Sequence, residues 1–141
     1  MTETMTIEQY KAAQFRDEFA LQVAICDWLR DNHPAVPFQS DWSGIRLTTG
    51  QAVKLNRVKY GRGWPDLFVA YPAHGFHGAY LELKLSVDDY RRQDGQLRQT
   101  RHIQEQNQML FKLRQLGYWA YFVGGHEEAI RTLEWYLIGV G

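Results

Sequence analysis

The chain has 141 residues, 45% of them hydrophobic, and a formal net charge of zero, which predicts one globular domain with a real core. A neutral chain has no global attraction for nucleic acid, so any such affinity must come from local clusters of basic residues. The sequence has no run of about 18 apolar residues, so we expect no membrane-spanning helix. No signal-peptide pattern begins the sequence, and the single cysteine, Cys26, cannot form an internal disulfide, so we expect a cytoplasmic location and core packing for Cys26.

The first predicted element is a helix that ends at Asn32. Residues 1–8 are polar, and we expect them to be frayed. Beyond them, apolar residues recur at three- and four-residue steps, the helical period: Phe15, Phe19, Val23, Cys26 and Leu29. His33-Pro34 ends the pattern, because proline disfavours a helical conformation in the residue before it. Glu18 and Gln22 lie one turn apart on this helix, and periodicity alone favours a solvated face for them.

The next segment combines a short strand with a basic helix. Residues 37–40 have the composition of a strand, and a turn is expected at 41–44. A helix is predicted from Thr48 to about Lys59, with Gly61 as its stop. All charged residues between positions 45 and 63 are positive, namely Arg46, Lys54, Arg57, Lys59 and Arg62. Such a block favours DNA binding, and an ordinary basic helix surface is the alternative.

A hairpin is predicted from two strands, residues 65–71 and 79–85, which are joined by a segment rich in proline and glycine. Pro65 can open the first strand, because proline is tolerated at a strand's first position. In the second strand, leucines alternate with Glu82 and Lys84, so that the leucines lie on one face and the charged pair on the other.

The register of this hairpin predicts a cluster of charged side chains. If the turn lies at His74-Gly75, Asp66 comes to lie opposite the segment from Glu82 to Lys84, and opposed Cβ atoms are about 5 Å apart. Two carboxylates at that distance repel each other unless a cation or a raised pKa relieves them. A divalent metal ion bound through oxygen is the simplest relief.

After the hairpin, residues 86–101 form a polar stretch that we expect to be a long, mobile loop with at most a brief helix. This stretch contains more arginine than aspartate. Two interpretations therefore remain, a flap that binds DNA and a solvated loop. A helix is predicted from His102 to Leu116, with Gly117 as its C-cap and a buried stripe of Ile103, Met109, Leu110, Leu113 and Leu116. A buried strand at 118–123 and a helix at 126–137 follow. These elements predict an α/β fold in which helices cover both sides of a mixed sheet.

Several of these residues carry a resemblance to a known family. Pro65-Asp66, a spacer and then Glu82-Leu83-Lys84 resemble the PD-(D/E)xK nuclease signature. The lead-in Gly61-x-Gly63-Trp64 resembles the virus-type replication-repair nuclease (VRR-NUC) domain of that superfamily. Helices with Glu18-x-x-x-Gln22 before the motif and Glu105-Gln106 after it extend the resemblance over most of the chain. It implies a single domain, residues 1–141, with a restriction-endonuclease-like fold.

The resemblance also implies a chemistry, the hydrolysis of DNA phosphodiester bonds with Mg²⁺ or Mn²⁺. The implied metal ligands are Asp66, Glu82, the Leu83 carbonyl and, directly or through water, Glu18. Lys84 would orient the attacking hydroxide or offset the charge of the transition state, and Gln106 would lie beside the metal. Without the resemblance, the acids and the lysine could form a surface salt bridge, and Gln106 could be solvated.

The resemblance finally implies a substrate. Small stand-alone members of the family, from phages or bacteria, would pair as homodimers and cut branched DNA such as four-way Holliday junctions, since two matched nicks need two symmetric sites. Two alternatives remain, a catalytically silent DNA-binding module of the same fold and a protein-interaction domain that uses Trp119 or Trp135. Trp64 is compatible with either core packing or base stacking, and Gly63 would let the backbone approach a phosphate or a strand end.

Overall fold

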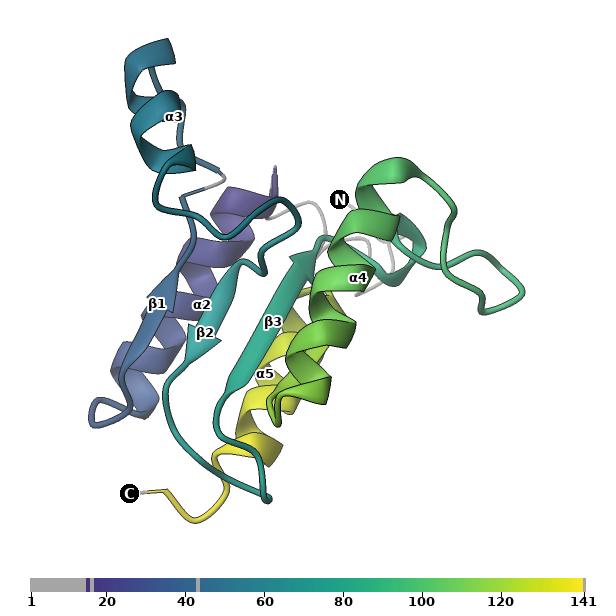
Figure 1. The fold of residues 1–141 in the computed structure, drawn as a ribbon. Helices are drawn as coiled ribbons and strands as arrows, with labels where there is room; N and C mark the ends of the chain where they lie inside the picture. Colours follow the sequence, from purple (N-terminus) through teal and green to yellow (C-terminus); the bar gives the residue numbers. More distant parts are fainter. Residues whose placement is uncertain (1–14, 16, 43, 141) are drawn as a thin grey trace, which may run out of the picture.

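The protein is built around a four-stranded mixed sheet with helices on both faces (Figure 1). The computed structural model describes Phe15, residues 17–42 and residues 44–140. The polar segment 1–8 and the beginning of the first predicted helix lie outside the described residues. The strands follow the order β1-β2-β3-β4 and are β1 (Phe38–Ser40), β2 (Leu67–Val69), β3 (Ala79–Lys84) and β4 (Trp119–Gly124). The first three strands are antiparallel and β4 runs parallel to β3, so the predicted mixed α/β sheet is confirmed.

The helices form the outer layers. The helices α2 (Glu18–Asn32) and α5 (His126–Tyr136) lie behind the sheet in Figure 1, and α4 (Arg101–Gln115), drawn beside β3, packs on the other face against residues of β3 and β4. The α4 helix also carries the chain from β3 to β4, the kind of crossover that two parallel strands require. In the described part of the chain, no helix is both long and apolar enough to span a membrane.

The α2 helix begins where the Asp17 side chain accepts a hydrogen bond from the Ala20 amide, at 2.8 Å. Its buried residues are Leu21, Gln22, Ile25, Cys26 and Leu29. The predicted stripe was therefore wrong in part, since Phe19 and Val23 are 38% and 42% exposed and Phe15 precedes the helix. The spacing of apolar residues predicted the helix correctly but not its buried face. That face is decided by contact with the sheet and with α5.

The predicted register of the hairpin is confirmed. Leu67 pairs with Leu81, and the same register places Asp66 opposite Glu82. The turn contains His74 and Gly75, whose φ angles of 53° and 83° lie in the left-handed region that turns of this kind use. All six residues of β3 are buried, because α2 and α5 cover one face of the strand and α4 the other. Glu82 and Lys84 are therefore not part of a solvent-facing hairpin.

Two expectations for the second half of the chain were wrong. The strand β4 is not fully buried, because it lies at the edge of the sheet and leaves Tyr121 44% exposed. Leu116 is 62% exposed, because α4 ends at Gln115 and its last buried residue is Leu113. Gly117, with φ of 99°, follows the end of the helix as expected.

The helix α3 (Thr49–Asn56) ends three residues before the predicted Lys59 and projects from the rest of the fold in Figure 1. A reciprocal capping box between Thr48 and Gln51 begins it, and none of its residues is buried.

The loop after β3 contains the brief helix that was expected, η1 (Val87–Asp89). Its arginines bond within the loop itself, since Arg98 donates to the Asp88 carbonyl at 2.6 Å and Arg92 pairs with Asp94 at 2.9 Å. The mobility of this loop and its grip on DNA stay predictions.

Candidate active site

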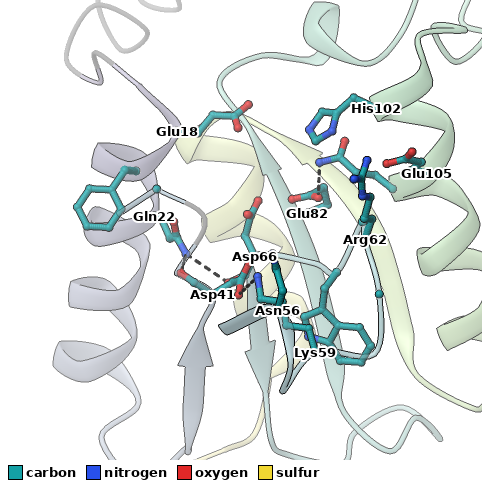
Figure 2. Close-up of a pocket in the computed structure, with 16 residues that line it drawn as sticks. Glu18, Gln22, Asp41, Asn56, Lys59, Arg62, Asp66, Glu82, His102 and Glu105 are labelled. Carbon is teal, nitrogen blue, oxygen red and sulfur yellow. Dashed lines mark hydrogen bonds and ion pairs between the residues drawn. The ribbon is translucent and has the colours of Figure 1, made fainter. Parts of the chain in front are cut away.

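Two carboxylates from neighbouring strands meet in one cavity. Asp66 lies just before β2, and its Oδ2 accepts a hydrogen bond of 2.9 Å from the Leu83 amide of β3. Glu82 is adjacent on β3 and is only 2% exposed. Both line a cavity of about 720 Å³, which we call the carboxylate cleft. Its other polar and aromatic lining residues are Glu18, Phe19, Gln22, Asp41, Asn56, Lys59, Arg62, Trp64, His102, Glu105 and Gln106 (Figure 2).

The backbone of Asp66 is fixed by a cluster of hydrogen bonds. Its carbonyl accepts from the Asp41 amide at 2.6 Å, and from Ser40 Oγ and Gln22 Nε2, both at 3.3 Å. Gln22 also donates to the Asp41 carbonyl at 2.9 Å and to Ser40 Oγ. Gln22 therefore connects α2 to the ends of β1 and β2, a role that sequence reasoning missed because nothing in a helical period distinguishes a buried glutamine from a solvated one.

Replacing Gln22 by alanine should destabilise the fold. The variant removes a side chain that is 4% exposed and leaves buried carbonyl groups with fewer donors. We expect a loss of about 1–3 kcal/mol in the free energy of unfolding. Chemical denaturation measures it, with Gln115→Ala, an exposed position in the last turn of α4, as the matched control. Equal stability of the two variants would show that the Gln22 bonds do not hold the site together.

The environment of Glu82 opposes a negative charge there. Burial, a hydrogen bond with Asp66 and the charge of Asp66 raise the pKa of Glu82 well above its ordinary value, in that order of importance, against the lowering effect of Lys84. Gln106 Nε2 of α4 donates to Glu82 Oε1 at 2.6 Å, so the amide holds the carboxyl group in place. The raised pKa of Glu82 means that its carboxyl group keeps a proton to higher pH than an ordinary glutamate.

This pKa shift has a consequence for stability. Above the ordinary glutamate pKa of 4.5, the folded protein holds a proton that the unfolded chain has released, so stability falls as pH rises toward the folded-state pKa. We expect Glu82→Gln to raise the melting temperature at pH 8 in EDTA, and to do so less at pH 4.5. A melting series over pH measures this, with Glu134→Gln on the exposed side of α5 as the control. A constant difference between Glu82→Gln and wild type at all pH values would contradict the assignment.

Lys84 and Glu18 form an ion pair at the edge of the site. Lys84 Nζ lies 3.8 Å from Glu18 Oε2, with side-chain exposures of 5% and 47%. Burial raises the pKa of Glu18, Lys84 lowers it, and Asp66 raises it further. Lys84 thus supplies a positive charge beside the buried Glu82, the partly buried Asp66 and Glu18.

The donor set fits a hard divalent cation. Within the described residues, no three His, Cys, Asp or Glu side chains gather closely enough to hold a metal ion by themselves. A protein nevertheless usually contributes only one or two carboxylate ligands to Mg²⁺, because the ion keeps several water ligands and binds substrate phosphates. Gln106 Oε1 is buried and accepts no hydrogen bond from the described residues, which leaves an oxygen for a cation or its water. The Leu83 carbonyl faces the same neighbouring strand as the Leu83 amide that bonds Asp66.

Gly63 connects the cleft to α4. Its φ is 79°, and a Cβ atom placed on it would lie 2.6 Å from the Glu105 carbonyl oxygen. The expectation that Gly63 makes room for a phosphate or a strand end is therefore corrected, because the close neighbour is the backbone of α4 next to Gln106. Trp64, the following residue, lies partly buried with its ring edge-on to Tyr80 at 5.6 Å.

The five predicted DNA-binding cations divide into two groups. Lys59 and Arg62 line the carboxylate cleft, where Lys59 pairs with Asp41 at 3.5 Å. Arg46, Lys54 and Arg57 are exposed on α3 and the turns that flank it. The structure brings together the two acids, Leu83, Lys84, Glu18 and Gln106, and places only two of the five cations beside them.

Comparison with known proteins is informative at the level of the fold. No protein-family model matches the sequence, and no curated protein matches it at a significant level. A solved structure described as a "VRR_NUC domain protein" superimposes with a TM-score of 0.58 at 21% sequence identity. The match covers 89% of this chain and 90% of that one. The chain therefore has the fold of that VRR_NUC domain protein, over nearly its whole length.

Proposed function

We propose that the protein is a metal-dependent endonuclease of the PD-(D/E)xK type that hydrolyses DNA phosphodiester bonds. The observation that carries the proposal is the meeting of the Asp66 and Glu82 carboxylates, from adjacent strands, in a cleft that is also lined by Glu18, the ion-pair partner of Lys84. Two carboxylates this close, one of them buried, are costly to keep charged unless they serve a cation. The shared fold with a VRR_NUC domain protein supports the same function.

The two carboxylates and the groups around them would each have a part in this chemistry. Asp66, Glu82 and the Leu83 carbonyl would hold Mg²⁺ or Mn²⁺, which supplies a water of lowered pKa and offsets phosphate charge. The Lys84 side chain, 5% exposed, lies beside them, and its ammonium can orient the attacking hydroxide or stabilise charge on the phosphate. Gln106 keeps the Glu82 carboxyl oriented, and Glu18 reaches the site through Lys84 or water.

The proposed substrate is branched DNA, including Holliday junctions, cut by a homodimer of the stand-alone phage or bacterial type. Support comes from the sequence resemblance and from the exposed cations on the projecting α3 segment, which extend the basic surface beyond the cleft: Arg46, Lys54 and Arg57. Two-fold symmetry would present two cleavage sites to a junction.

Cleavage assays test the proposal. Labelled four-way junction, flap and linear duplex would be incubated with Mg²⁺, Mn²⁺ or EDTA. The expected result is metal-dependent strand scission that is fastest on the branched substrates. Salt-dependent binding in EDTA with no scission in either metal would instead favour the silent DNA-binding module.

A further inference from the structure

A second cavity opens beside the carboxylate cleft. It has a volume of about 460 Å³, and we call it the aromatic groove after its lining rings, Trp42, Tyr60, Trp64, Phe68 and Tyr80. Asp41, Lys59 and Trp64 line both cavities, so the two share a wall. Pro65, which directly precedes the Asp66 of the candidate active site, also lines the groove. An occupant of the groove is therefore an immediate neighbour of anything bound at the carboxylates.

The groove exists because α4 covers only part of its face of the sheet. Gln39, Phe68 and Tyr80 lie directly opposite one another on β1, β2 and β3, and so belong to one face. On that face the α4 residues Met109, Leu110 and Leu113 pack against Tyr80 and Ala120. Figure 1 shows β1 and β2 beside α4 with no helix in front of them. On this side Phe68 is only partly buried, whereas Tyr80, which α4 contacts, is 9% exposed.

Two rings of the groove are stacked on each other, and two others are exposed at its border. Phe68 stacks on Tyr80 with centroids 4.4 Å apart and an interplanar angle of 27°. Trp42 and Tyr60 border the groove and are 52% and 71% exposed. Tyr60 is held by Lys112, whose Nζ bonds its hydroxyl group at 2.9 Å and lies 5.3 Å from its ring centroid. Planar rings of this kind are the surfaces on which unpaired bases stack.

Two polar features favour a nucleotide over an apolar protein segment. The ammonium of Lys59 lies on the wall between the two cavities, where a phosphate that joins their occupants would pass. Gln39 lines the groove with a side-chain amide that both donates and accepts, as the edge of a base requires. If a phosphate of a DNA strand lies at Asp66 and Glu82, a neighbouring base of that DNA strand is therefore within reach of the groove aromatics, the Lys59 ammonium and the Gln39 amide.

We propose that the aromatic groove binds an unpaired nucleobase next to the scissile phosphate. The inference rests on the proposed nuclease function and makes it more specific, because the preferred substrate is then DNA with an unpaired nucleotide at the cut site. Continuous duplex DNA keeps its bases stacked and paired, so it cannot fill the groove without a cost in base pairing.

The test compares two duplexes of equal length in EDTA, one continuous and one with a single unpaired 5-iodouracil. Ultraviolet crosslinking and mass spectrometry identify the residue that contacts the base, and fluorescence anisotropy gives both affinities. We expect crosslinks to groove aromatics and tighter binding of the unpaired duplex. Trp42→Ala and Tyr60→Ala should each reduce that preference by about tenfold. Trp135→Ala and Tyr121→Ala, at exposed aromatic positions on α5 and β4, are the matched controls.

The outcomes separate this inference from the nuclease proposal. Equal affinity for the two duplexes, or equal effects of the groove variants and their controls, would overturn the inference even if both duplexes are cut in Mg²⁺. A base preference that Trp42→Ala removes, with no cleavage in any metal, would support the groove and refute the nuclease. If Trp42→Ala abolishes self-association in sedimentation and leaves DNA affinity unchanged, the groove is a protein interface and the inference is wrong.

Discussion

Asp66→Asn should reduce DNA cleavage by at least about 100-fold while leaving the fold unchanged. The asparagine side chain retains an oxygen that can accept the 2.9 Å bond from the Leu83 amide, so the register of the hairpin is kept. What it loses is the negative charge that, together with Glu82, would bind the metal ion. Single-turnover cleavage of a labelled junction in Mg²⁺ measures the effect, and circular dichroism verifies the fold.

Asp41→Asn is the matched control, since Asp41 lines the same cleft and is also an aspartate. Its carboxylate pairs with Lys59 at 3.5 Å instead of joining Glu82. We expect it to lower cleavage by less than about tenfold, because the lost pair is a peripheral one. If both variants were equally inactive, general loss of charge in the cleft would explain the result, and the specific role of Asp66 would be refuted.

Gly63→Ala should lower the free energy of unfolding by about 2 kcal/mol or more. The φ of 79° disfavours any side chain, and the new Cβ atom would meet the Glu105 carbonyl oxygen at 2.6 Å. That oxygen belongs to the backbone of α4, so relief requires a shift of the helix that carries Gln106. We therefore expect cleavage to fall together with stability, as measured by denaturation and by the junction assay.

Gly61→Ala is the control for this change. It adds the same methyl group two residues earlier in the same loop, where no heavy atom lies within 4 Å of the added Cβ. Wild-type stability and activity are expected for Gly61→Ala. A similar loss in both variants would mean that a side chain anywhere in this loop is destabilising, and the contact between Gly63 and α4 would be refuted as the specific cause.

The proximity of the two acids could be predicted from the sequence because it depends on local rules. Alternation of leucines with Glu82 and Lys84 sets the faces of β3, and a turn at His74-Gly75 sets its register against β2. Together these rules place Asp66 opposite Glu82. The burial of both faces of β3 could not be predicted in the same way, because it depends on helices that pack from distant parts of the chain.

The features that sequence reasoning missed all depend on contacts between distant segments. Gln22 connects α2 to the ends of two strands, and Gly63 fits against α4, over 40 residues away. The exposure of Phe19 and Leu116 depends on which face of a helix meets the sheet. The spacing of apolar residues does not decide between two adjacent faces of a helix. The exposure of Tyr121 follows from the edge position of β4, which no local pattern encodes.

We propose that Asp66 and Glu82 hold one cation between them. Anomalous diffraction from a crystal soaked in Mn²⁺ tests it most directly. The expected result is a peak between the two carboxylates, at about 2.0–2.3 Å from their oxygens, and its disappearance in an Asp66→Asn crystal. A saturated soak that leaves the space between Asp66 and Glu82 without a peak, or that places manganese elsewhere in the cleft, would contradict the claim.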